Sequence, residues 1–379
     1  MSDLMANLKK YKRLDIYENK EQNQPLDEER SYYIQNKMMK FYKIIRDKEN
    51  PYYSTLFMSD NKGEIYMCEF VKDNKITKIT NFGCICNDSK YILVDIIKST
   101  KYDFFFSLNL NPCLNIFKIK NNIKEGKKEI ELLQHINLKD KKTKSKYNKL
   151  FEFNSLQKDY LIIFGEEKIE LLSKDNSKDI VNYQKVYTLK YDKNNNGDNF
   201  IENKISNVFQ INDERLVLFN KGKLELIIIK INELVNKKNN KNSTNIEIIN
   251  KINIKGVKGQ FERISSFFID KDYIFLGLSD SLVLVSVAYG EIIQTYKIGK
   301  VIRMKIINEQ KDIVVFAETN EDEFYFIKYK FVEYYGLIEE NRIKYDKWFY
   351  KFDVIQNGEI IAIYDVKGLI TLLKYEKLN

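Results

Sequence analysis

Short apolar stretches alternate with tight polar breaks along most of the chain, and few stretches are long enough for a typical helix. Residues 271–299 are representative, with three apolar runs separated by polar breaks at 278–280 and 289–291. Runs that are apolar at consecutive positions, such as 226–229, are typical of strands in sheets that are covered on both faces. The pattern therefore predicts an all-β protein.

These runs recur as copies of one four-stranded unit. Five bursts begin near the acidic landmarks Asp159, Glu214, Asp272, Asp312 and Glu359, which are 40 to 58 residues apart. An apolar run precedes each burst and further runs follow it. Four strands repeated at about 40–50 residues are typical of propeller blades. With two earlier copies, the sequence predicts seven blades at 38–83, 88–138, 147–190, 204–256, 261–299, 301–345 and 349–379.

The seventh copy has three strands, so its sheet is expected to need a fourth one. Sheets that are apolar on both faces stay dry only against a neighbour on each side, and seven of them satisfy one another by closing a circle. The run at 11–18, "YKRLDIYE", is a candidate for the missing outer strand. Residues 1–37 are therefore interpreted as a closing strand and a connector, and residues 38–379 as a seven-bladed β-propeller with four-stranded antiparallel blades.

One blade resembles the WD-repeat family. Gly277, Ser279 and Asp280 match its hairpin turn, Val283 and Val285 match inward positions of the third strand, and 290–291 match the next turn. Segments 58–70 and 363–375 match the same turn more loosely. The chain departs from the family where Ser286 and Val287 replace its Trp-Asp pair, and no Gly-His pair precedes a blade. The only histidine is His135 and the only tryptophan is Trp348.

Composition narrows the possible roles. The formal net charge is +9, but it comes largely from Lys in a chain also rich in Asn, Ile, Tyr and Phe, residues with A/T-rich codons. Genome composition is therefore an alternative to nucleic-acid binding as its cause. Four cysteines (Cys68, Cys84, Cys86 and Cys113) are too few for a disulfide scaffold, and are interpreted as reduced thiols. The start lacks a signal peptide, so we expect a soluble cytoplasmic or nuclear protein.

The sequence offers little for catalysis. It contains no nucleotide-binding fingerprint or calcium loop, and no metal or other cofactor is expected. His135 is interpreted as a structural or surface residue. Asp95, Asp103 and Asp353 lie on or near predicted inner strands and are the candidates for a propeller enzyme with paired carboxylates, as a second alternative.

The main expectation is a non-catalytic scaffold or adaptor, a protein–protein interaction platform and subunit of a larger complex. Polar insertions are predicted to be surface loops, interpreted either as tolerated low-complexity segments or as a docking edge; they lie at 120–129, 139–149, 191–199 and 231–245. The first alternative is an RNA- or DNA-associated subunit that uses the same lysines on phosphates. The candidate partner-binding residues are Lys124, Lys127, Lys128, Lys141, Lys142, Lys144, Lys237, Lys238 and Lys241.

Overall fold

The structure is a computed structural model, and the described part of the chain has gaps. It comprises residues 38–46, 50, 53–71, 75–76, 80–85, 92–122, 127–139, 146–155, 158–166, 168–174, 181–190, 205–236, 241–257, 265–307, 312–319, 323–332, 336–345, 349, 351–355, 360–364 and 370–374. In this part there is no helix that is long and apolar enough to cross a membrane.

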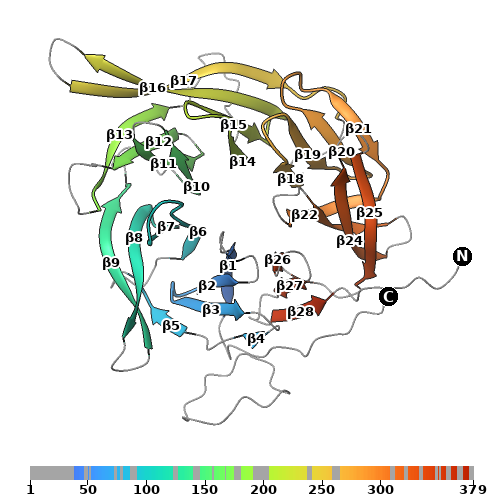
Figure 1. Ribbon diagram of the computed structural model, residues 1–379, viewed down its shortest axis with the longest axis horizontal. Helices are drawn as coiled ribbons and strands as arrows, with labels where there is room; N and C mark the ends of the chain where they lie inside the picture. Colours follow the sequence, from blue (N-terminus) through green and yellow to red (C-terminus); the bar gives the residue numbers. More distant parts are fainter. Residues whose placement is uncertain are drawn as a thin grey trace, which may run out of the picture. The chain divides into compact units, whose positions relative to one another are not determined.

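The described strands form seven sheets (Figure 1). The first three are β1 (Met39–Arg46), β2 (Ser54–Asp60), β3 (Ile65–Val71), β4 (Lys75–Ile76) and β5 (Thr80–Gly83); β6 (Leu93–Lys98), β7 (Phe105–Asn109), β8 (Cys113–Asn122) and β9 (Lys127–Asn137); and β10 (Tyr147–Asn154), β11 (Asp159–Gly165), β12 (Lys168–Lys174) and β13 (Tyr183–Lys190). Six of the seven sheets are meanders of consecutive antiparallel strands, and in the first sheet β4 and β5 both pair with β3.

The other four sheets follow in chain order. They are β14 (Ile205–Gln210), β15 (Arg215–Asn220), β16 (Glu225–Asn236) and β17 (Lys241–Asn253); β18 (Ser265–Phe268), β19 (Tyr273–Gly277), β20 (Leu282–Ser286) and β21 (Ile292–Tyr296); β22 (Lys300–Ile306), β23 (Ile313–Glu318), β24 (Phe324–Val332) and β25 (Gly336–Lys344); and β26 (Lys351–Ile355), β27 (Ile360–Tyr364) and β28 (Ile370–Lys374).

Polar side chains fix the tight turns between these strands. Asp60 Oδ1 accepts the N–H groups of Lys62 and Glu64, each at 2.9 Å, so the turn between β2 and β3 is held by one carboxylate. Asn220 does the same for Gly222 at 3.1 Å between β15 and β16. Asp and Asn thus supply the turn chemistry in a chain with only three prolines.

The predicted fold class is confirmed: the chain is an all-β, seven-bladed propeller with four-stranded antiparallel blades. The sheet β26–β27–β28 has three described strands. The closing strand predicted at 11–18 lies outside the described residues, as does Trp348. Cys68 and Cys84 are free thiols, and Cys86 lies outside the described residues.

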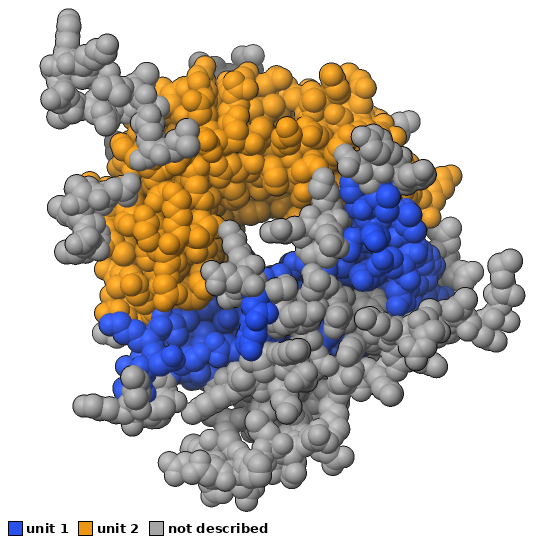
Figure 2. Space-filling model, in the orientation of Figure 1, with its two compact units in different colours: residues 1–93, 119–130, 303–379 blue, residues 94–118, 131–302 orange. Residues whose placement is uncertain are grey.

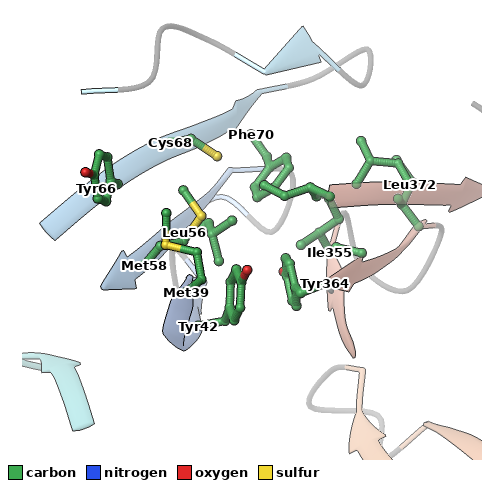
Figure 3. Packing of buried hydrophobic residues seen from close by; sticks show 13 residues of the cluster. Met39, Tyr42, Leu56, Met58, Tyr66, Cys68, Phe70, Ile355, Tyr364 and Leu372 are labelled. Carbon is green, nitrogen blue, oxygen red and sulfur yellow. The ribbon is translucent and has the colours of Figure 1, made fainter. Parts of the chain in front are cut away.

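The chain divides into two compact units (Figure 2). Unit 1 comprises residues 1–93, 119–130 and 303–379, and unit 2 comprises residues 94–118 and 131–302. In unit 1, the sheet that begins at β1 packs on the sheet that begins at β26. The rings of Tyr42 and Tyr364 stack there with centroids 4.8 Å apart, among Met58, Cys68 and Leu372 (Figure 3).

The core of unit 2 consists of three apolar clusters, and each one joins neighbouring sheets. One cluster contains Phe106 of β7 and Leu161 of β11, the next contains Ile162 of β11 and Leu218 of β15, and the third contains Val217 of β15 and Leu276 of β19. Consecutive residues such as Leu161 and Ile162 face opposite neighbours. This is why the strands are apolar at every position rather than at alternate ones.

A one-residue β-bulge recurs in the outer strands. The pairing register shifts at Val186 in β13, at Ile249 in β17 and at Ile293 in β21, so each of these residues has no partner on the third strand. The first strands show a comparable shift at Lys40, Asn148 and Ser206. Bulges re-aim side chains and bend a strand away from further pairing. No sequence signal located these positions.

Candidate functional site

Polar side chains of the first strands tie neighbouring blades of unit 2 together. Asp95 Oδ2 on β6 accepts the N–H of Leu150 on β10 at 2.8 Å. Lys149 Nζ on β10 donates to the carbonyl of Ser206 on β14 at 2.7 Å. Asn207 Nδ2, beside it on β14, donates to Ser266 Oγ on β18 at 2.7 Å. A ladder of such bonds links four successive blades.

The loop between β6 and β7 is fixed to the third sheet by two carboxylates. Glu152 on β10 accepts from Ser99 Oγ at 2.6 Å and from the Thr100 N–H at 2.5 Å. Asp159 forms an ion pair with Lys101 and accepts from Tyr102 Oη at 2.8 Å. The hydrogen bond to Asp159 raises the pKa of Lys101 above its usual value. Both carboxylates are buried, so these contacts hold the loop in one place.

An arginine performs the equivalent task in unit 1. The guanidinium of Arg46, at the end of β1, donates to the carbonyls of Ile306 at 2.9 Å, Ile307 at 2.6 Å and Val354 at 3.2 Å. One side chain therefore joins three blades through main-chain acceptors. Burial lowers its pKa, and the nearby charge of Asp353 opposes that effect.

Asp353 is the charged centre of the same region. Its Oδ2 lies 3.2 Å from Lys305 Nζ, and Lys351 donates to the carbonyl of Tyr42. Burial alone raises the pKa of Asp353, but the positive charges of Lys305, Lys351 and Arg46 outweigh burial and hold the pKa below its usual value. The carboxylate is therefore ionised and serves as a counter-ion.

The three candidate catalytic carboxylates have different surroundings. Asp95 links two blades of unit 2, Asp103 is exposed, and Asp353 lies in unit 1 beside Lys305. His135 Nδ1 lies 2.7 Å from Asn115 Oδ1 on the neighbouring strand. Among the residues with described positions, no three His, Cys, Asp or Glu side chains are placed to hold a metal ion.

The nine candidate lysines are only partly described. Lys128, on β9, forms an ion pair with Glu69 of β3. Lys127 on β9 and Lys241 on β17 have described strand positions but no described side chains, and the other six lie outside the described residues. Two of the predicted loops are largely strand. β8 and β9 extend to Asn122 and from Lys127, and β16 and β17 extend to Asn236 and from Lys241.

The long hairpin β16–β17 is the largest departure from the blade pattern that the sequence predicts. Strand β15 pairs with β16 only as far as Lys230, whereas β16 and β17 remain paired to Asn236 and Lys241 (Figure 1). β17 contacts β13 of the preceding blade. At its other end the Lys255 N–H donates to the carbonyl of Gly290, in the turn before β21, at 2.9 Å. One strand thus spans the outer side of three blades of unit 2.

The outer-strand surface, as we call it, lies on β13, β17 and β21. Its apolar members are Val186, Ile248, Ile249 and Ile293, of which Ile293 is 52% exposed and Ile249 43%. Its cationic members are Lys185 on β13, Lys251 on β17 and Lys297 directly after β21, and all three are exposed. β17 also carries the exposed carboxylate of Glu247. Sequence reasoning missed this surface because these residues belong to runs that look like ordinary strands, and a bulge turns some of them outward.

Comparison with known proteins identifies the fold and nothing more. The sequence matches no known family and no curated protein. The C-terminal WD40 domain of Sif2 has a TM-score of 0.59 at 10% identity, covering 99% of this chain and 100% of that chain. Sqt1 of Chaetomium thermophilum, bound to the N-terminus of ribosomal protein L10, has a TM-score of 0.55 at 9% identity. The match covers 97% of this chain and 100% of that chain. BBS1N in complex with ARL6DN has a TM-score of 0.54 at 9% identity, and the match covers 89% of this chain and 91% of that chain. The chain is therefore similar in fold to WD-repeat propellers.

Proposed function

We propose that the chain is a non-catalytic protein-interaction platform that works as a subunit of a larger protein assembly. The observation that carries this proposal is the use of polar groups on the first strands. Asp95, Glu152 and Asp353 are held by main-chain N–H groups, hydroxyls or cations that join blades. A general acid or base must exchange protons with a substrate, and groups in such fixed structural contacts are poorly suited to it.

The exposed side of unit 2 supports a binding role. Hydrogen-bonded outer strands that carry exposed apolar side chains offer a partner a preformed surface, which lowers the entropic cost of association. Two solved propellers of similar fold are complexes with protein partners, the N-terminus of ribosomal protein L10 and ARL6DN. These two complexes support the proposal that the partner of this chain is also a protein. The free thiols of Cys68 and Cys84 fit a reducing compartment, the cytoplasm or the nucleus.

The nucleic-acid alternative has less support. Of the nine lysines assigned to it, the one with a described side chain, Lys128, is paired with Glu69 at 2.5 Å. Phosphate binding by Lys128 would have to break that ion pair first.

The test is to purify the full chain under non-denaturing conditions from cells in which it is expressed at its natural level. We expect it to migrate in a complex well above its own mass of 45.2 kDa, with protein subunits at constant stoichiometry that survive nuclease treatment. Migration as a monomer in fresh extract would overturn the proposal. Loss of the complex on nuclease treatment would instead favour the nucleic-acid alternative.

A further inference from the structure

Acidic and basic side chains of the outer-strand surface differ in the partners that they have within the chain. Glu247 accepts a hydrogen bond from Asn232 Nδ2 at 2.8 Å, and Glu291 lies 3.4 Å from Lys255 Nζ. Glu291 thus has a cationic partner, whereas among the described residues Glu247 has only a neutral amide partner and keeps its negative charge. Lys251 and Lys297 have no carboxylate partner in the described part of the chain.

Lys185 adds to this excess. It lies 3.6 Å from Glu170 Oε1, but the same oxygen already has Lys168 at 2.8 Å, and Lys168 is buried with it. Two cations face one carboxylate, and Lys185 is the one on the surface. Three exposed lysines, against the one carboxylate of Glu247 that lacks a cationic partner, thus lie on or directly after the strands that carry Val186, Ile248, Ile249 and Ile293.

The bulges restrict how a partner can bind here. An outer strand with a regular edge can accept another strand through its main chain, but a bulge interrupts the row of N–H and C=O groups. β13, β17 and β21 each carry one. Recognition at this surface must then come from side chains, as when an amphipathic helix lays its apolar face on exposed aliphatic groups.

We propose that the outer-strand surface of unit 2 is the docking site for an acidic amphipathic helix of a protein partner. The inference rests on the proposed function and specifies its partner class. The aliphatic side chains of Val186, Ile248 and Ile249 receive the apolar face of the helix. Its carboxylates meet Lys185, Lys251 and Lys297.

The experiment uses two synthetic helical peptides of about 18 residues that share one leucine face. One carries glutamate and the other lysine on its polar face. Binding to the full chain is measured by fluorescence anisotropy at low and at physiological salt. We expect the glutamate peptide to bind, the lysine peptide not to bind, and the affinity to fall as salt rises.

Two variants locate the site. The double variant Ile248→Ser with Ile249→Ser and the double variant Lys185→Glu with Lys251→Glu should each weaken binding of the glutamate peptide about tenfold or more. Ile338→Ser is the matched control, because Ile338 is an isoleucine of comparable exposure (50%) on β25, followed by Glu339 and Glu340. It should leave affinity unchanged. Melting temperatures of all variants verify that they are folded.

Several results would overturn the inference. They are equal binding of both peptides, no binding of the glutamate peptide, an equal loss in Ile338→Ser, or self-association of the chain through Ile248 and Ile249 in sedimentation. If the native complex persists in the Ile248→Ser, Ile249→Ser variant, this docking site is wrong while the platform function stands. If no native complex exists in the wild type, the platform function itself fails.

Discussion

The guanidinium of Arg46 donates to the carbonyl of Ile307 at 2.6 Å, across 261 residues of sequence. With the bonds to Ile306 and Val354, it joins the first, sixth and seventh blades of unit 1 at one point. Since the acceptors are main-chain atoms that are partly buried, loss of the donor leaves them without compensation.

Arg46→Met should therefore lower the free energy of unfolding by about 3 kcal/mol, and Arg46→Lys by about 1–2 kcal/mol, because one ammonium cannot serve three carbonyls. Urea denaturation measures both. Arg342→Met is the control: Arg342 is a more exposed arginine paired with Glu339, and should cost less than about 1 kcal/mol. Equal losses at Arg46 and Arg342 would contradict the role of Arg46.

The ionised carboxylate of Asp353 predicts that the stability of the fold depends on pH. Its folded-state pKa lies below the unfolded value of about 3.9, so its contribution to stability is present above that pH and is lost as pH falls through the folded pKa. Asp353→Asn should lower the melting temperature at pH 7, and the gap to the wild type should shrink as the solution is acidified below about pH 4. Thermal melts at successive pH values measure the gap. A gap that stays constant down to pH 3 would show that its charge is not what stabilises the fold.

Gly290 tests the contact between the fourth and fifth blades. It has φ +68°, and a Cβ at this position would lie 2.6 Å from the carbonyl oxygen of Asn253 and 2.8 Å from Ile252 Cγ2. Gly290→Ala should cost about 2–3 kcal/mol of unfolding free energy, from the steric clash and the backbone conformation together.

Gly83→Ala separates the two contributions. Gly83 has the same φ of +68°, but no atom lies within 4 Å of an added Cβ, so only the backbone cost of about 1 kcal/mol applies. If both variants lose the same free energy of unfolding in urea, the close approach of Gly290 to β17 does not contribute to the cost of the substitution.

The closing strand remains a prediction from the sequence. Deletion of residues 1–20 should lower the melting temperature of the whole domain in one cooperative transition, because the sheet β26–β27–β28 would lose its fourth strand. Deletion of residues 1–10 keeps the run at 11–18 and should have no such effect. Unchanged melting of the longer deletion would show that another segment completes this blade.

The sequence predicted the blades well because burial on both faces leaves a local signature. Leu226 to Ile229 is apolar at every position, and such runs recur at blade spacing. The sequence did not predict the extended hairpin, because Asn and Lys dominate 231–245, a composition typical of loops. In the structure, β16 and β17 remain paired as far as Asn236 and Lys241. Arg46 gave no local signal either, since its acceptors are 260 to 308 residues away.

The way the blades are linked has a consequence for how such a sequence evolves. In the contacts of Arg46, Lys149 and Asp95, one partner is a side chain and the other is a peptide group, which every amino acid supplies. Substitution on the acceptor side therefore leaves the bond intact, and only half of each link is under selection for residue identity. Blades held in this way tolerate sequence change at the accepting positions without losing the bonds between them.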